Sequence, residues 1–215
     1  MLEERLYYQL EPPQDPQEFL RTWETGNDAQ RDGLAGVAIA IKKENYAGII
    51  IKSLEEKYQQ APDEERKHIV ATFDRLGARN SRIEKTTTNL LISLLDADSK
   101  QAVAIVNGLQ NKTQRAAIRI LDPRETKRSS EDEIMIAKEI LLITGKKYID
   151  IISGNFSDEV KDRTWRGMWY CAALPELRPE IESALTKLAD TTPSPELQKG
   201  ARVELNNIIK KLGPR

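Results

Sequence analysis

Residues 181–208 read IESALTKLADTTPSPELQKGARVELNNI, and this stretch decides the fold class. Apolar residues recur at helical spacing before Asp190 and after Pro195, and Pro193 and Pro195 interrupt the pattern between the two halves. Residues three or four positions apart share one face of a helix, so each half predicts an amphipathic helix. Because the connection is short, we expect the two helices to be antiparallel neighbours.

The opening of the second helix in this hairpin recurs along the chain. Six such helix starts follow one another at intervals of 27 to 37 residues, at Gln30, Glu65, Gln101, Glu133, Val160 and Leu197. The positions four and eight residues after each start are apolar in eleven of twelve cases, and Thr164 is the exception. A repeat of this length, with one apolar face per helix, is typical of stacked helical hairpins.

Helical periodicity continues over most of the chain, and no segment has a convincing strand pattern. Asp15 before Pro16 predicts the start of the first helix. Further helices are expected at 28–43, 46–60, 62–76, 81–95, 99–109, 111–121, 131–144, 146–153, 157–173, 178–190 and 195–212. The connection at 122–130 is the longest, and its charged residues predict a flexible loop. We therefore expect an N-terminal extension at residues 1–14 and a single helical-repeat domain at residues 15–215.

The C-terminal hairpin resembles the HEAT repeat family, in which a leucine-rich helix, an aspartate-proline turn and a second helix form one unit. The residues that carry this resemblance are Leu185, Leu188, Asp190, Pro193, Leu197, Ala201, Leu205 and Ile208. The resemblance implies an all-α, HEAT- or armadillo-like superhelix, a right-handed stack of antiparallel helical hairpins. It also implies a structural ladder of acidic and basic residues at Asp28, Arg31, Asp63, Arg66, Asp158 and Lys161. Gln198 and Ala102 depart from the basic position of the pattern, and Ser99 and Pro195 depart from the acidic one.

An irregular all-α domain and a fold that contains a sheet stay open as alternatives. The chain is 39% hydrophobic and 31% charged, a balance that is typical of amphipathic helices and argues against disorder. The formal net charge of −1 argues against a dedicated nucleic-acid binder, which is usually much more basic. Cys171 and His68 are the only cysteine and histidine, so disulfides, cysteine-rich metal sites and paired catalytic histidines are excluded within one chain. We expect Cys171 to be a core thiol, and we expect no cofactor, no metal and no membrane span in a cytoplasmic protein.

Two segments combine residue types that recognise partners. The first has a net charge of +4 over seventeen residues, from Lys112, Arg115, Arg119, Arg124, Lys127 and Arg128 against Asp122 and Glu125. Such a patch can bind phosphate or an acidic peptide, and the alternative is a solvated helix face beside a charged loop. In the second, Trp165, Trp169 and Tyr170 lie among the basic residues Lys161, Arg163 and Arg166. These aromatic residues can stack on bases, anchor a protein partner, or pack between neighbouring helices.

The leading functional hypothesis is a non-enzymatic scaffold or adaptor that binds a macromolecular partner, with a protein as the first choice, because the chain repeats a helical unit and contains no reactive cluster. The first alternative is a nucleic-acid-binding protein, including an enzyme that is similar in architecture to the HEAT-like DNA alkylation repair glycosylases. A further resemblance in architecture is to chromophore lyases that handle bilins. The residues select neither alternative, and they predict no oligomeric state.

Overall fold

The computed structural model describes residues 12–213, and this part of the chain consists of twelve α-helices and one short 3-10 helix, with no strand. The all-α class expected from the sequence is confirmed. The chain divides into two compact units, residues 1–108 and 109–215, and the division falls within helix α7 (Ala102–Leu121). The expected single domain stays a prediction, and most of the expected N-terminal extension lies outside the described residues.

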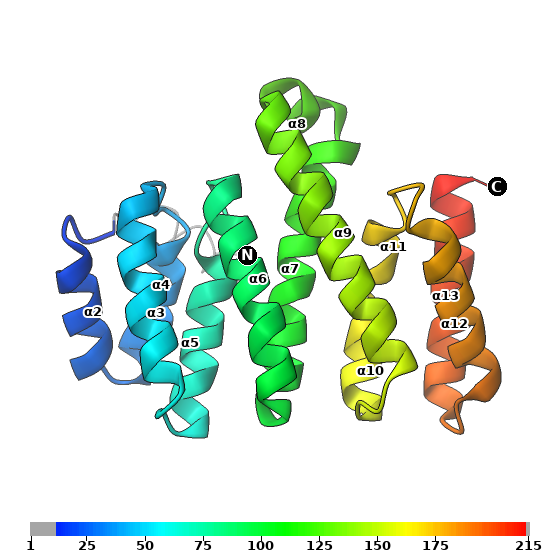
Figure 1. Cartoon of the computed structure of the whole chain (residues 1–215), viewed down its shortest axis with the longest axis horizontal. Coiled ribbons are helices and arrows are strands. Elements are labelled where there is room, and N and C mark those ends of the chain that lie inside the picture. The colour runs from blue at the N-terminus through cyan, green and yellow to red at the C-terminus, as the bar shows by residue number, and fades with distance from the viewer. Residues whose placement is uncertain (1–11, 214–215) are drawn as a thin grey trace. The chain divides into compact units, whose positions relative to one another are not determined.

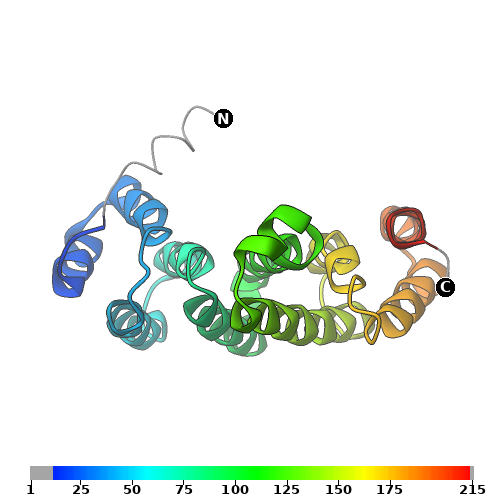
Figure 2. The same cartoon turned by 90° about the horizontal axis from the view of Figure 1, so that it is seen from above.

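The first unit contains five complete α-helices and the start of α7. They are α2 (Pro16–Thr25), α3 (Asp28–Ala38), α4 (Glu44–Tyr58), α5 (Asp63–Arg75) and α6 (Ser81–Ala97), followed by the 3-10 helix η1 (Ser99–Gln101). Helix α3 packs against α5, and α4 contacts both α2 and α6. The helices of this unit therefore lie in two layers (Figure 1 and Figure 2).

Local sequence signals fix the ends of these helices. Asp15 caps α2, and Asn27 caps α3 in a reciprocal capping box with Gln30. These side chains satisfy backbone amides that have no partner within the helix. Gly77 turns the chain between α5 and α6 with a φ of 91°, and a Cβ atom there would lie 2.4 Å from the amide nitrogen of Glu84. Only glycine fits this position without strain.

The same aromatic–arginine contact occurs twice in the first unit, at positions 35 residues apart (23 and 58, 31 and 66). The Arg31 guanidinium lies 5.0 Å from the centroid of the Trp23 ring, and its Nε donates to the Trp23 carbonyl oxygen at 3.1 Å. The Arg66 guanidinium lies 5.3 Å from the centroid of the Tyr58 ring, and its Nε donates to the Tyr58 carbonyl oxygen at 3.1 Å. Both arginines therefore hold the end of the preceding helix in place.

Acidic residues complete these contacts. Asp98 is 9% exposed, and its Oδ2 accepts hydrogen bonds from the Tyr58 hydroxyl and from Arg66, each at 3.0 Å. Lys100 pairs with Asp63 at 3.4 Å. Asp98, which lies 35 residues after Asp63, therefore takes the acidic position that the sequence analysis assigned to Ser99. The assignment was wrong by one residue because the third helix start was counted from Gln101, which is 36 residues after Glu65.

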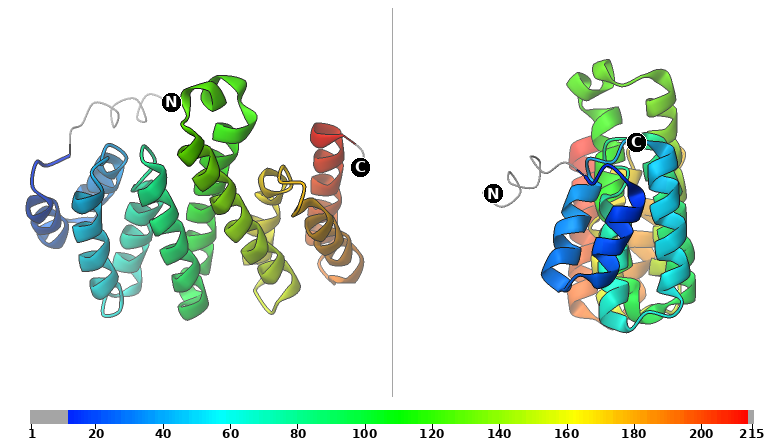
Figure 3. Two further views of the ribbon diagram at one scale, coloured as in Figure 1. Left: turned by 45° about the horizontal axis from the view of Figure 1, so that its top comes forward. Right: turned by 90° about the vertical axis from the view of Figure 1, so that its left-hand side faces the viewer.

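The second unit contains six complete α-helices besides residues 109–121 of α7. They are α8 (Pro123–Arg128), α9 (Glu131–Ser153), α10 (Asp158–Trp165), α11 (Met168–Cys171), α12 (Arg178–Thr191) and α13 (Pro195–Leu212). Helix α9 packs against α12, and α13 packs against α12, α10 and α11. Figure 3 shows α8 at the amino-terminal end of the long helix α9.

The expected loop at 122–130 was wrong, because α8 lies within it. Asp122 caps α8 and Pro123 occupies its first turn, which is the combination that also starts α2. The charged residues that suggested a loop are good helix formers. The short helix is closed at its other end by Ser129, whose amide donates to the carbonyl oxygen of Glu125.

Three glycines account for two expected helix breaks that are absent and for one break that was not expected. Gly108 and Gly145 end no helix, because α7 and α9 run through them. A Cβ atom at Gly145 would lie 2.6 Å from Leu177 and 3.0 Å from Cys171, so glycine permits close packing there. The helix expected at 157–173 is broken at Gly167, between α10 and α11.

The predicted core positions are largely confirmed. Of the twelve positions placed four and eight residues after a helix start, eleven are buried, and Leu205 is partly exposed. Thr164, the polar member of the set, is fully buried, and its hydroxyl donates to the Val160 carbonyl oxygen at 2.8 Å. This bond within the helix satisfies the hydroxyl and makes its burial possible.

Candidate binding surface

The basic segment predicted in residues 112–128 is divided by the structure into buried and exposed residues. Lys112 is fully buried in α7, so its assignment to a binding surface was wrong. It follows Leu109 by three positions and precedes Ala116 by four, which places it on the buried stripe of the helix. Arg115 and Arg119 are partly buried and already engage other groups of the protein.

The remaining bases of this segment, Arg124, Lys127 and Arg128, are exposed on α8. Arg124 lies 3.7 Å from the Asp122 carboxylate, and Arg128 lies 3.2 Å from the Glu125 carboxylate. The first turn of α9 adds three acidic residues directly after α8, at 131, 132 and 133. Residues 115–133 therefore hold five bases and five acids, and they form no strongly positive surface.

The second predicted segment forms a cluster of aromatic rings along one face of α13. The Trp165 indole lies against Gly200, where an added Cβ atom would approach within 2.6 Å of the ring. Trp169 donates its backbone amide to Glu204 Oε1 at 3.1 Å, and Lys211 Nζ lies 3.7 Å from the centroid of the Trp169 ring. Positions 200, 204 and 211 are four and eleven residues apart, so they share one face of α13.

Neighbouring groups fix the orientation of Trp165. Its Nε1 donates to Asp162 Oδ1 at 3.2 Å, while Arg166 donates to Asp162 Oδ2 at 2.7 Å. The Arg166 guanidinium also lies 5.4 Å from the centroid of the Trp165 ring. The indole N–H therefore finds the local acceptor expected for a packed tryptophan, and the ring remains partly exposed.

Trp169 and Tyr170 form a tilted ring pair in α11. Their ring centroids are 4.0 Å apart, with 32° between the planes, and both residues are partly exposed. Burial, followed by the nearby negative charge of Glu204, raises the pKa of the Tyr170 hydroxyl above its ordinary value of 10.0. We refer to Trp165, Arg166, Trp169, Tyr170 and Lys211 together as the aromatic cluster.

Glu204 supports the aromatic cluster from the α13 side. It is 2% exposed, and Oε2 accepts a hydrogen bond from the Asn207 amide at 3.2 Å. Burial raises the pKa of the Glu204 carboxyl above its ordinary value of 4.5, while the bonds from Asn207 and Trp169 and the charge of Lys211 act in the opposite direction. A carboxylate is therefore held under the rings at a cost in desolvation.

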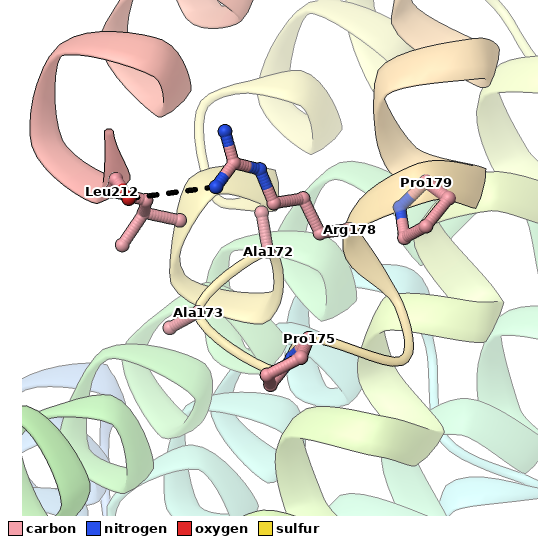
Figure 4. A pocket seen from close by; sticks show the side chains of 6 residues that line it. All are labelled: Ala172, Ala173, Pro175, Arg178, Pro179 and Leu212. Carbon is pink, nitrogen blue, oxygen red and sulfur yellow. Dashed lines mark hydrogen bonds between the residues drawn. The ribbon is translucent and has the colours of Figure 1, made fainter. Parts of the chain in front are cut away.

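A pocket of about 340 Å³ lies between the start of α12 and the end of α13 (Figure 4). Its lining consists of Ala172, Ala173, Pro175, Arg178, Pro179 and Leu212. Arg178 donates from Nε to Glu182 at 2.7 Å and from its terminal nitrogens to the carbonyl oxygens of Leu212, at 3.5 Å, and Gly213, at 2.6 Å. Its guanidinium thus caps the end of α13, and the other five lining residues are apolar.

Two residues of the predicted site have local structural roles. Arg163 is partly buried, its Nε is buried without a hydrogen-bond partner among the described residues, and its carbonyl oxygen accepts from the Gln110 side chain. Lys161 lines a second pocket of about 220 Å³ together with Asp158 and Lys187. The structure therefore brings Trp165, Arg166 and Trp169 to one helix face and gives Arg163 and Lys161 other neighbours.

The remaining reactive side chains lie apart from the aromatic cluster. Cys171 is fully buried, as expected, and burial raises the pKa of its thiol to about 12. His68 is partly buried between two aspartates of α3, with Nδ1 3.0 Å from Asp32 and Nε2 3.3 Å from Asp28. Among the described residues, no three histidine, cysteine, aspartate or glutamate side chains are grouped so that they could hold a metal ion.

The sequence analysis did not identify Glu204, Lys211 or Arg178 as part of this surface. Glu204 carried a usable signal, since it follows Ala201 by three positions and precedes Ile208 by four, both of them core residues. A charged residue inside such a stripe indicates a buried polar contact. Lys211 carried no such signal, because its aromatic partner comes from another helix, and the contacts of Arg178 with Leu212 and Gly213 also come from outside its own helix.

Comparison with protein-family models, with curated proteins and with solved structures gives no match to this chain. No helix among residues 12–213 is both long enough and apolar enough to cross a bilayer.

Proposed function

We propose that this protein is a non-enzymatic scaffold that binds a protein partner through the aromatic cluster. The observation that carries the proposal is the alignment of three partly exposed aromatic residues, Trp165, Trp169 and Tyr170, along one face of α13. Tryptophan, tyrosine and arginine dominate the binding energy of protein interfaces, and orientation in advance reduces the entropy lost on binding. A hydrogen bond holds the indole of Trp165 in the unbound protein, and another holds the backbone of Trp169.

The proposed architecture is a right-handed, HEAT-like stack of antiparallel helical hairpins, which supplies a rigid support for this surface. Two observations support it. Helices lie in two layers within the first unit, and the contact between Trp23 and Arg31 recurs 35 residues later between Tyr58 and Arg66. Contacts that repeat at a fixed interval are typical of arrays in which each unit packs only on its neighbours.

The proposal is tested by measuring binding with surface variants. The full chain is used in cross-linking to identify a partner, which is then purified and titrated calorimetrically against wild type, Trp165→Ala and Trp169→Ala. A hot-spot residue contributes about 2 kcal/mol or more, so each variant should weaken binding about thirtyfold. Met135→Ala is the matched control, because Met135 is 55% exposed on α9, outside the cluster, and should have no effect.

Two outcomes would contradict the proposal. In the first, cross-linking recovers only the protein itself. In the second, a purified partner binds both tryptophan variants with wild-type affinity although circular dichroism shows that they are folded.

Exposed bases on α8 support nucleic-acid binding as the second candidate function. Arg124, Lys127 and Arg128 all reach solvent, although the acids that follow in α9 balance them. Gel shifts at increasing salt test this alternative with a triple variant that changes the three residues to glutamate. Binding that weakens steeply with salt and is lost in the triple variant would favour nucleic acid over protein.

A further inference from the structure

We infer that Trp169 and Tyr170 form a binding site for an organic cation, the guanidinium or ammonium group of a basic side chain on the partner, and that Lys211 occupies this site in the unbound protein. The inference rests on the proposed function, because it names the chemistry that the aromatic cluster recognises. It also reverses the charge of the ligand that the sequence suggested.

The position of Lys211 is the main evidence. Its Nζ lies 3.7 Å from the centroid of the Trp169 ring, and the Tyr170 ring lies 4.0 Å from that of Trp169. The face of an aromatic ring carries partial negative charge and attracts a cation within about 6 Å, and indole attracts it most strongly. The protein therefore already holds an ammonium group in the place where a ligand cation would bind.

The surrounding electrostatics favour a cation over an anion. The Glu204 carboxylate lies on the same face of α13, and its charge acts on both Lys211 and Tyr170. Its two oxygens are oriented by the Trp169 amide and by Asn207. A carboxylate that is 2% exposed cannot leave the site, so its field acts on whatever occupies the rings. An anionic ligand would meet this charge unfavourably.

Lys211 is held more weakly than the other cations that lie over aromatic rings. Arg31 and Arg66 also donate to backbone carbonyl oxygens, and Arg166 pairs with Asp162. Lys211 is exposed in the last turn of α13, and within residues 12–213 it makes no ion pair at 4.0 Å or less. A flexible side chain held by the ring and by the more distant charge of Glu204 can be displaced by a ligand that brings its own contacts.

Residues that closely follow those of the site in the sequence line an apolar pocket. Leu212, which follows Lys211, lines the pocket together with Ala172 and Ala173, which follow α11. An apolar residue next to the basic residue of a partner segment would find this pocket. The expected ligand is therefore a short segment with a basic side chain beside an apolar one.

The experiment measures binding of a small cationic probe to the full chain. The probe is acetyl-Gly-Arg-Gly-amide, its charge control is acetyl-Gly-Glu-Gly-amide, and the readout is the indole N–H signal of Trp169 in an NMR titration. Lys211→Met removes the ammonium that competes with the arginine probe for the Trp169 ring. This variant should therefore bind the arginine probe about three- to tenfold more tightly than wild type does. Lys210→Met is the matched control, and it should leave the affinity unchanged.

Variants of the rings and of the acid complete the test. Trp169→Leu lacks the Trp169 signal, so the indole N–H signal of Trp165 is its readout, and this variant should not bind the arginine probe. Glu204→Gln should weaken binding of the arginine probe, while the glutamate probe should bind none of the proteins. The inference is overturned if Lys211→Met binds the arginine probe as wild type does, or more weakly. It is also overturned if the glutamate probe or a single-stranded oligonucleotide binds wild type and loses affinity in Lys211→Met, since Lys211 would then contact an anionic ligand directly.

The outcome is separable from that of the proposed function. If a protein partner loses affinity with Trp169→Ala but the arginine probe does not bind, the scaffold function stands and the cation site falls. If the probe binds as expected but no protein partner depends on Trp169, the cation site stands and the scaffold function falls. Circular dichroism of each variant separates loss of the site from loss of the fold.

Discussion

The contact between Trp165 and Gly200 makes a quantitative prediction about Gly200→Ala. A Cβ atom at position 200 would lie 2.6 Å from Trp165 Cε2, 2.7 Å from Cζ2 and 2.8 Å from Nε1. These distances are shorter than van der Waals contact, so the indole must move, and overpacking of this kind costs about 1–3 kcal/mol. Alanine is better than glycine within a helix by about 1 kcal/mol. We therefore expect a net loss of stability of between about 0 and 2 kcal/mol.

Two matched controls isolate the steric part of this effect. Gly33 in α3 and Gly48 in α4 also lie within helices, and an added Cβ atom at either position would meet nothing within 4 Å. Gly33→Ala and Gly48→Ala should each raise the free energy of unfolding by about 1 kcal/mol. Gly200→Ala should therefore lie about 1–3 kcal/mol below these controls in urea unfolding followed by circular dichroism.

A double-mutant cycle assigns the loss to the indole. In a Trp165→Ala background the obstacle is absent, so Gly200→Ala should become stabilising by about 1 kcal/mol, like the controls. The reasoning would be refuted by a Gly200→Ala variant that gains as much stability as Gly33→Ala in the wild-type background. It would also be refuted if the change measured for Gly200→Ala were the same with and without Trp165.

Three further predictions concern the titratable side chains of Cys171, Glu204 and Arg66. Burial raises the pKa of the Cys171 thiol to about 12, so the native protein should resist thiol labelling and the unfolded chain should react. Labelling of the native protein at the rate of the unfolded chain would contradict the burial of Cys171. Because the pKa of Glu204 is raised in the folded state, the folded protein holds a proton that the unfolded chain has released, and wild-type stability should fall as the pH rises from about 4.5 through the folded pKa. Urea unfolding of Glu204→Gln should lack this decrease, and an unchanged slope would show that Glu204 is not its source. Arg66→Ala removes hydrogen bonds to Asp98 and to a backbone carbonyl oxygen and should lower the free energy of unfolding by about 2–3 kcal/mol. Lys67→Ala breaks only an exposed ion pair within the same helix and should lower it by less than about 0.5 kcal/mol. Equal losses in the two variants would contradict the structural role of Arg66.

The features that the sequence predicted correctly depend on local periodicity. Leu34, Phe73 and Leu141 are buried because apolar residues repeat with the helical period, which is visible without knowledge of any other helix. Asp15 with Pro16 predicted a helix start for the same reason. Asp122 with Pro123 carried the same local signal, and the loop prediction failed because charge was given more weight than capping.

The site residues were harder to predict because their roles depend on contacts between helices. Arg166 and Lys211 both lie over aromatic rings, but only Arg166 is close to its ring in sequence. Gly200 gave no sign that it leaves space for an indole from another helix. Such pairings arise from the packing of α10 and α11 on α13, which no local pattern specifies.

Whether a charged side chain packs inside the protein or binds a partner depends more on its position relative to the buried apolar residues of its helix than on the sign of its charge. Lys112 and Glu204 both lie three residues after one buried apolar residue and four before another, and both are buried. Such a charge belongs to the internal packing of the protein and cannot reach a partner freely, however basic or acidic the surrounding sequence is. Lys211 lies on the same face of α13 as Glu204 but in its last turn, where the side chain is exposed and is held by the Trp169 ring and by the more distant charge of Glu204. A partner can therefore replace the ammonium of Lys211, while Glu204 stays in place and sets the charge that the partner must carry.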